Sequence, residues 1–211
     1  AARDITDLGP STPNVIIQPV ATFSNSASIY MRGIGGQDIE STVESPVGIS
    51  IDGVIVTRPV ATMLDTFDLE RIEVLRGPQG TSFGKNSLAG GIAAHTKNPT
   101  GEWGGKAELT FGNYGRFDAR ASLNVPIAED VLAARIYAAR EHYNGYFTNR
   151  VDDKHIGGQN RVSVRGTLLA TPSDAVEVNL KMFFVRDRSS APGGDSAPDR
   201  TKLLYIGLLI A

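Results

Sequence analysis

Hydrophobic and polar residues alternate strictly along five segments of the chain after Pro99. The segments are 106–111, 117–125, 132–138, 162–170 and 176–184. In the second segment one face holds Phe117, Ala119, Ala121, Leu123 and Val125, and the other holds Arg116, Asp118, Arg120, Ser122 and Asn124. Because successive side chains of a β-strand point to opposite faces, this period of two predicts five consecutive strands, each with one apolar and one polar face.

Two architectures contain strands of this kind, a soluble antiparallel sheet packed on a core and a membrane barrel. The longer segments have about ten residues, the length that crosses a bilayer when tilted, whereas soluble strands more often have about five or six. Arginines and carboxylates opposite an uncharged face suit a wet lumen and a lipid exterior. Short connections at 126–130 and 171–174 and long ones at 144–160 and 186–202 also fit a barrel. The pattern favours the barrel and leaves the soluble sheet open.

The first hundred residues have a different organisation, with short β-rich segments between turns. Glycine and proline, 23 and 11 in the chain, recur so often that few helices of ordinary length fit. Asp52-Gly53 between two apolar runs is a hairpin signal, and Thr66–Glu70 is expected to form a short helical turn. The sequence therefore predicts a small α+β domain over 1–99, followed by antiparallel membrane-barrel strands over 100–211.

Composition and charge exclude several classes of protein. With 41% hydrophobic residues the chain can bury a core, and 21 Lys plus Arg against 23 Asp plus Glu predict no nucleic-acid partner. The absence of cysteine excludes disulfides, a thiolate metal site and a cysteine nucleophile. The sequence starts without an initiator Met or a signal peptide, so we expect it to lie within a longer protein. Its longest apolar run, Leu203–Ala211, is too short for a membrane helix and is interpreted as the start of a strand.

The stretch RGPQGTSFGKNSLAG at 76–90 contains two partial enzyme motifs. A phosphate loop requires glycine where Gln79 stands and Ser or Thr where Asn86 stands, so that motif fails at two positions. The segment around Ser82 matches the nucleophile elbow of serine hydrolases, but it neither follows a strand directly nor precedes a good helix start. The histidines, His95, His142 and His155, lack an acid partner and metal-ligand spacing. We therefore predict no catalytic residue, no metal site and a loop whose glycines let the backbone pack tightly.

Longer motifs around this loop resemble the plug domain of TonB-dependent outer-membrane receptors. The resemblance rests on Leu69–Asn86 (LERIEVLRGPQGTSFGKN), Ala89–Ile92 (AGGI) and Thr96–Pro99 (TKNP). Two upstream motifs, Ile29–Gly33 (IYMRG) and Ile51–Val54 (IDGV), match plug motifs in the same order. The resemblance covers about residues 5–187, and the junction that it implies between plug and barrel falls at the change of pattern near Pro99.

The resemblance implies a plug folded inside a barrel of about 22 strands in the outer membrane of a Gram-negative bacterium. It implies active uptake, without cofactor or enzymatic activity, of an external ligand such as an iron–siderophore complex or other metal chelate, cobalamin or an oligosaccharide. Energy comes in this family from the inner-membrane protein TonB, which pulls on an N-terminal box not found in this sequence. The first plug strand is also missing, and about five barrel strands follow, so we expect a fragment. A β-rich binding protein that reuses the plug without transport is the alternative.

The resemblance also implies where ligand contacts lie. The motif arginine Arg32 and the segment Thr57-Arg58 after the Asp52-Gly53 hairpin correspond to positions near bound ligand, and Gln37 and Asp38 lie in the adjoining loop. A second set, Glu70, Arg71, Glu73 and Arg76, is expected to form a charge network between plug and barrel. In that network the arginines would pair with carboxylates of the lumen.

Overall fold

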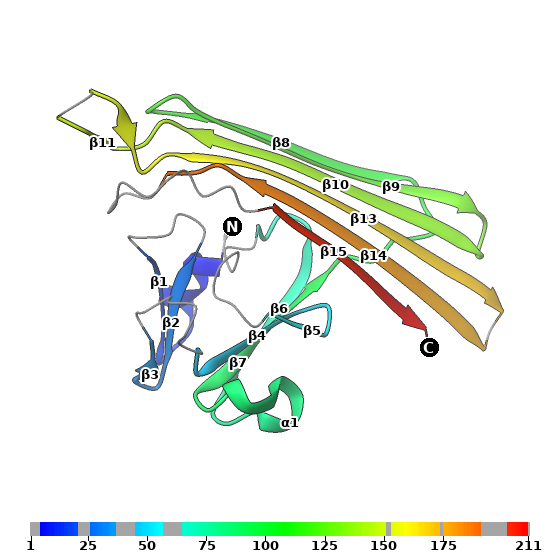
Figure 1. Ribbon diagram of the computed structural model, residues 1–211. Helices are drawn as coiled ribbons and strands as arrows, with labels where there is room; N and C mark the ends of the chain where they lie inside the picture. The colour runs from blue at the N-terminus through cyan, green and yellow to red at the C-terminus, as the bar shows by residue number, and fades with distance from the viewer. Residues whose placement is uncertain are drawn as a thin grey trace. The chain divides into compact units, whose positions relative to one another are not determined.

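The computed structural model describes residues 5–20, 26–36, 45–56, 65–150, 153–173, 175–190 and, for the backbone alone, 202–210. Two compact units make up the chain, Ala1–Lys97 and Asn98–Ala211 (Figure 1). No helix in the described part of the chain is long and apolar enough to cross a membrane.

The N-terminal unit consists of short strands in two sheets. The first sheet has the order β1-β2-β3, with β1 Val15–Pro19, β2 Ala27–Met31 and β3 Ile34–Gly35. The second has the order β5-β4-β7-β6, with β4 Val47–Ile51, β5 Val54–Val56, β6 Leu69–Arg76 and β7 Gly90–Thr96. A 3-10 helix, η1 (Ile5–Ser11), precedes β1, and α1 (Gly80–Phe83) and η2 (Gly84–Asn86) connect β6 to β7. The pair β4–β7 is parallel, and the other pairs of both sheets are antiparallel.

Apolar side chains from both sheets share one buried core. Its members are Ile5, Val15, Ile17, Ala27, Ile29, Met31, Val47, Ile49, Ala89 and Ile92. Met31 on β2 and Ile92 on β7 are completely buried, so the core joins the two sheets. Full burial of a side chain of this size contributes about 1.5–3 kcal/mol, which makes the core the main source of stability for the unit.

Two tight hairpin turns in this unit follow from their sequences. Arg32 and Gly33 have φ values of 53° and 81°, and Asp52 and Gly53 have 49° and 83°. Two consecutive positive φ values are the geometry of a type I′ turn, which Asp-Gly favours, so the hairpin predicted at Asp52-Gly53 is confirmed. The Asp52 carboxylate also accepts hydrogen bonds from the N–H and the hydroxyl of Thr96, each 2.8 Å, and thereby fixes the turn to the end of β7.

The short helical turn predicted over Thr66–Glu70 is wrong. Leu69 and Glu70 already belong to β6, and a turn over 66–68 precedes it. The Asp65 carboxylate accepts a hydrogen bond from the Phe67 N–H at 2.9 Å. This is the local side-chain contact by which an aspartate stabilises a turn in place of a helix.

The C-terminal unit is a sheet of six antiparallel strands in the order β15-β14-β13-β10-β9-β8 (Figure 1). The strands are β8 Gly104–Gly112, β9 Arg116–Ala128, β10 Leu132–Tyr143, β13 Gln159–Ser173, β14 Val176–Asp187 and β15 Lys202–Ile210. A small hairpin, β11 Phe147–Thr148 and β12 His155–Ile156, lies in the connection between β10 and β13. The apolar run Leu203–Ala211, which was interpreted as the start of a strand, lies largely in β15, and β15 pairs with β14.

The two faces of this sheet are inverted relative to a soluble protein. Polar residues of β9 are buried, with Asp118 only 1% and Arg120 only 4% exposed. Apolar residues of the opposite face are exposed: Leu123 46%, Ile136 51%, Leu168 36%, Met182 46% and Phe184 38%. In water such a face would forgo about 25 cal/mol per Å² of apolar surface. The arrangement is the one expected of strands whose outward side meets lipid.

Aromatic side chains gather where the long connections leave the sheet. Phe111 and Phe117 lie with ring centroids 5.3 Å apart, and Tyr146 packs against Tyr114 at 5.0 Å and Tyr143 at 5.3 Å. Aromatic residues at this level are typical of the boundary between the apolar band of a barrel and water.

Candidate functional site

Arg32 occupies the first position of the turn between β2 and β3. Its backbone N–H donates a hydrogen bond to the carbonyl of Asn14 at 2.9 Å, which ties the turn to the residue preceding β1. The side chain is exposed, and its Nη1 would lie 3.6 Å from a Cβ atom placed on Gly77. The backbone therefore fixes this ligand candidate on an exposed turn, with its guanidinium beside Gly77.

Arg76, the last residue of β6, lies close to the same place. Its Nη1 donates a hydrogen bond to the carbonyl of Pro13 at 3.2 Å. Pro13 and Asn14 are neighbours, so Arg32 and Arg76 are attached to one loop and both are exposed there. We call this pair the arginine corner. Its planar guanidinium groups suit carboxylates and other anionic oxygens.

The other ligand candidates, Gln37, Asp38, Thr57 and Arg58, lie outside the described residues. The described strands nevertheless show where the chain leaves β5. Val56, the last residue of β5, pairs with Ile49, and β4 begins two residues earlier at Val47. Val47 pairs with Gly90, which pairs with Arg76. The chain therefore leaves β5 toward the end of the sheet at which Arg76 lies.

Three of the four residues predicted as a charge network are in contact with one another. Arg71 Nε donates to Glu73 Oε1 at 2.7 Å, and its Nη1 lies 3.4 Å from Glu70 Oε1. His95 Nε2 lies 3.5 Å from the same Glu73 oxygen. The hydrogen bond from Arg71 lowers the pKa of Glu73, and the bond to Glu73 raises the pKa of Arg71. The side chains of Arg71, Glu70 and Glu73 are exposed and that of His95 is partly buried, so water screens their interaction.

Within the 76–90 stretch, close packing is seen at Gly90, where a Cβ would lie 2.3 Å from the carbonyl oxygen of Leu75, but not at Gly80 or Gly84, where a Cβ would meet nothing within 4 Å. Two glycines outside the stretch also permit close packing. A Cβ on Gly91 would lie 2.6 Å from the Phe83 ring, and one on Gly48 would lie 2.7 Å from Phe83 Cβ. Phe83 is buried against the paired strands β4 and β7, over Gly48 and Gly91, and this contact holds the α1 turn on the sheet. Ser82 lies within α1 and is exposed, not at a sharp turn between a strand and a helix. The geometry of a nucleophile elbow is therefore not formed at Ser82.

An apolar cavity of about 230 Å³ lies between this turn and the sheet. Its lining includes Ile29, Val47, Ile55 and Phe83, with Lys85 and other residues of the loop. Pockets for drug-sized ligands have volumes of about 300–1,000 Å³. The cavity is therefore too small for a large metal chelate.

Ion pairs connect four strands across the buried face of the C-terminal sheet. Arg120 on β9 contacts Glu108 of β8 at 3.1 Å and Glu141 of β10 at 2.8 Å. Arg161 on β13 donates through Nε to the second oxygen of Glu141 at 2.7 Å and also contacts it through Nη2. Removing one partner of a buried pair costs about 3–5 kcal/mol, because the other charge is left without compensation.

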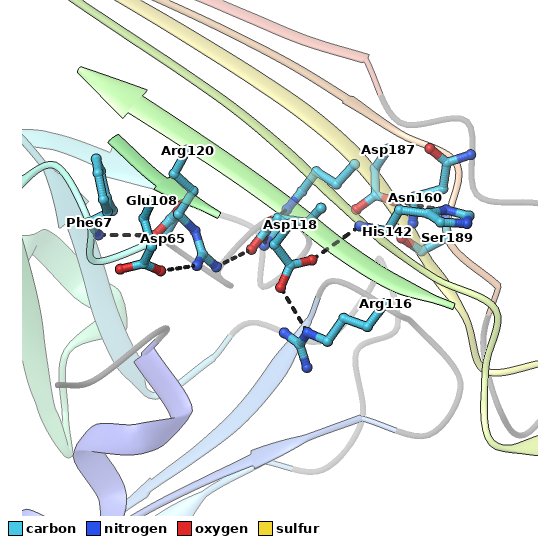
Figure 2. Close-up of polar contacts among 12 residues, drawn as sticks. Asp65, Phe67, Glu108, Arg116, Asp118, Arg120, His142, Asn160, Asp187 and Ser189 are labelled. Carbon is cyan, nitrogen blue, oxygen red and sulfur yellow. Dashed lines mark hydrogen bonds and ion pairs between the residues drawn. The ribbon is translucent and has the colours of Figure 1, made fainter. Parts of the chain in front are cut away.

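A second group of polar contacts lies beside the first (Figure 2). Arg116 Nε donates to Asp118 at 2.8 Å, and the other oxygen of Asp118 accepts from the backbone N–H of His142 at 3.2 Å. Asp118 and Glu141 are direct register partners. Two carboxylates opposite one another are stable here because arginines neutralise both.

The sequence identified the polar face that carries these groups but not the contacts. Glu108, Arg120, Glu141 and Arg161 come from four strands, and their pairing depends on the register between strands. Arg165 was missed in the same way. It lies over the rings of Tyr137 at 5.3 Å and Phe183 at 5.5 Å, one on each neighbouring strand. Alternation of charged residues on one face was the only signal in the sequence for these contacts.

Comparison with protein-family models assigns a domain to most of the N-terminal unit. Residues 1–91 match the model of the TonB-dependent Receptor Plug Domain. Residues 1–91 therefore match a plug domain of the TonB-dependent receptors, and the strands that follow share the antiparallel fold of the solved receptor structures. Both the resemblance and the predicted fold class are confirmed.

The relatives of the chain include siderophore receptors and pesticin receptors. The chain is 28% identical over 160 residues to the catecholate siderophore receptor Fiu of Escherichia coli, covering 74% of this chain and 19% of the relative. It is 23% identical over 181 residues to the ferrioxamine B receptor of Salmonella typhimurium, covering 83% and 24%. The pesticin receptor of Yersinia pestis is 23% identical, with 82% and 26% covered. The chain thus spans about a quarter or less of the length of these relatives.

Solved structures show the same fold. The ferric yersiniabactin uptake receptor FyuA of Yersinia pestis superposes with a TM-score of 0.79 at 22% identity, covering 89% of this chain and 29% of that one. The copper transporter OprC superposes with a TM-score of 0.76 at 17% identity, covering 98% and 31%. At these identities the likeness establishes the fold and not the ligand.

Proposed function

We propose that the chain is the plug and the first barrel strands of an outer-membrane receptor that takes up an iron–siderophore complex with energy from TonB. The observation that carries the proposal is the joint presence of a plug domain and a sheet with a polar buried face and an apolar exposed face. The names of the relatives support a siderophore as ligand. The alternative, a soluble β-rich binding protein, would leave the apolar face in water at a high cost in free energy.

Ligand contact is proposed for Arg32, Gln37, Asp38, Thr57 and Arg58. The support for Arg32 is its exposed position in the arginine corner, and the support for Thr57-Arg58 is the direction in which the chain leaves β5. An arginine fork offers charge-assisted hydrogen bonds to the carboxylate, catecholate or hydroxamate oxygens of a ferric chelate.

A mechanical role is proposed for Glu70, Arg71, Glu73 and Arg76. Exposed charges on β6 are suited to pairs with carboxylates and arginines of a barrel lumen, and such pairs are individually weak. Weak pairs hold a plug in place yet separate when TonB pulls on the N-terminal segment of a complete receptor. The plug would then rearrange without any catalytic group.

The test is uptake by the complete receptor in a Gram-negative host that lacks its own siderophore receptors. Cells expressing the receptor are offered radioactive iron bound to a catecholate, to ferrioxamine B or to yersiniabactin, with TonB present or deleted. We expect uptake of one chelate class, in the presence of TonB alone. Equal uptake without TonB, or recovery of the receptor in the soluble fraction, would contradict the proposal.

A further inference from the structure

One register row crosses the C-terminal sheet near the ends that carry the long connections. The row contains Ala119, Arg140, Val162, Arg186 and Lys202, on five adjacent strands. Arg140 and Arg186 are exposed, and each lies on the same face of its strand as exposed apolar residues, such as Ile136 on β10 and Phe184 on β14. Both arginines therefore project from the apolar face of the sheet, not from the buried polar face.

The negative charges of the same region point the other way. Glu141 follows Arg140, Asp187 follows Arg186, and both carboxylates are buried, at 4% and 1% exposure. Glu141 is paired with Arg120 and Arg161, and Asp187 accepts the N–H of Ser189 at 2.8 Å. Among the described residues neither Arg140 nor Arg186 has an ion-pair partner. The exposed side of this row is therefore positively charged.

The spacing of the two arginines and their surroundings define the chemistry of a ligand. Val162 separates them in the row, so their backbones lie two strand spacings, about 10 Å, apart. On the side of the row away from the long connections, the apolar face begins with Ala138 on β10 and Phe184 on β14. On the side toward those connections lies the exposed Phe117 of β9. A guanidinium at such a boundary can hold a phosphate through two parallel hydrogen bonds while acyl chains cover the band.

We propose that Arg140 and Arg186 form a binding site for the phosphate groups of an anionic membrane lipid on the outer wall of the barrel. The site rests on the proposed function, because it requires these strands to span a membrane. A lipid fits the site since the same molecule supplies phosphate for the arginines and acyl chains for the apolar band. The lipid is bound from the side of the barrel, independently of the ligand that enters the plug.

The experiment measures which lipid the complete receptor retains. Purified receptor in a non-ionic detergent is mixed with equal amounts of phosphatidylglycerol and phosphatidylcholine of the same acyl chains, and bound lipid is counted by native mass spectrometry. We expect a preference for phosphatidylglycerol that falls about fivefold in Arg140→Gln or Arg186→Gln, and about 25-fold in the double variant, from the usual contribution of one basic residue at an anionic surface. Arg150→Gln, which removes an exposed arginine of the β10–β13 connection, is the matched control and should keep the preference.

Each remaining outcome decides the question. Equal binding of both lipids by the wild-type receptor, or an unchanged preference in the double variant, would overturn the site. Competition by free glycerol phosphate at the same concentration would overturn the assignment to a lipid. Both arginines are exposed, so the single variants should fold, which the electrophoretic shift on heating of an intact barrel checks. Recovery of the wild-type receptor in the soluble fraction would overturn the proposed function as well, whereas membrane recovery without lipid preference overturns this site alone.

Discussion

Gly90 shows how strictly one residue of the plug is determined by its backbone. It has φ 151°, and a Cβ there would lie 2.3 Å from the carbonyl oxygen of Leu75 and 2.5 Å from the sulfur of Met31. We expect Gly90→Ala to destabilise the pairing of β6 with β7 by about 1–3 kcal/mol, the cost of a strained backbone position. Hydrogen exchange of the β6 and β7 amides in the complete receptor measures that loss directly.

Gly80 is the matched control for this substitution. A Cβ on Gly80 meets nothing within 4 Å, and Gly80 lies in α1, where alanine is the better helix former. Gly80→Ala should therefore leave exchange in β6 and β7 unchanged or slightly slower. Equal exchange rates in the two variants would show that Gly90 is not required for the close approach of the strands.

The contact between Arg71 and Glu73 makes a pH-dependent contribution to the plug. The hydrogen bond from Arg71 lowers the pKa of Glu73 from its ordinary value of 4.5. A lowered pKa in the folded state means that the stabilisation is present above pH 4.5 and is lost as the pH falls through the lower folded value. Removing Arg71 should therefore destabilise the plug at neutral pH and make no difference in strong acid.

The measurement compares the opening of β6 and β7 in the wild type and in Arg71→Ala at pH 7 and at pH 3. Because the side chains are exposed, we expect a small difference at pH 7 that shrinks at pH 3 and in high salt. Arg71→Lys preserves the positive charge, so it should retain part of the stabilisation and differ less from the wild type than Arg71→Ala does. A difference that grows on acidification would show that Arg71 acts by packing and not through Glu73.

At the level of elements, alternation located the long strands because their two faces differ in polarity along the whole length. Each of the five predicted segments lies within an observed strand; β8, β9 and β13 extend further at both ends, and β10 and β14 extend further at their C-terminal ends. The apolar run of β15 has leucine, tyrosine and isoleucine at successive positions, so no alternation marked its length. The turn at 66–68 was missed because one aspartate side chain, Asp65, decides it.

If the exposed apolar face meets lipid, as proposed, substitutions on the two faces of one strand should have different costs. Leu168 lies mid-strand on the exposed face of β13, between Ala134 and Leu180 in register. Leu168→Lys should cost about 2–4 kcal/mol near the bilayer midplane, because a cation replaces a lipid-facing leucine. The free energy of unfolding in urea, measured with the complete receptor in lipid vesicles, checks this value.

Leu168→Phe at the same position is the control and should be nearly neutral in lipid. Thr167 next to it is buried, so Thr167→Ser tests the opposite face without introducing a charge. A cost for Leu168→Lys no larger than for Leu168→Phe would contradict the assignment of this face to lipid.

At the level of the whole molecule, the sequence predicted the plug fold but not the side-chain contacts within it or within the C-terminal sheet. The motifs from Ile29 to Pro99 pointed to a plug, because a long motif constrains a fold even where single residues do not. The ion pairs around Glu141 could not be foreseen, since residues 108, 120, 141 and 161 meet through strand registers that no local pattern encodes. The arginine corner could not be predicted either, because Arg32 and Arg76 are 44 positions apart in the sequence and come together only through their contacts with one loop.

For the proposed receptor, the sharpest prediction about ligand recognition concerns Arg58. The chain leaves β5 toward the end of the sheet where Arg76 lies, and Arg58 follows Val56 by two residues. If Arg58 holds an anionic oxygen of the ligand, Arg58→Ala should weaken binding by about 1.5–3 kcal/mol, the contribution of a hydrogen bond to a charged group. Calorimetric titration of the purified receptor with the ferric chelate identified in the uptake test measures this change, and receptor abundance should stay constant. Arg150→Ala, in a connection of the C-terminal sheet, is the control for the loss of one exposed positive charge. Unchanged affinity in Arg58→Ala would assign recognition to Arg32 in the arginine corner instead, where Arg32→Ala should then produce the same loss.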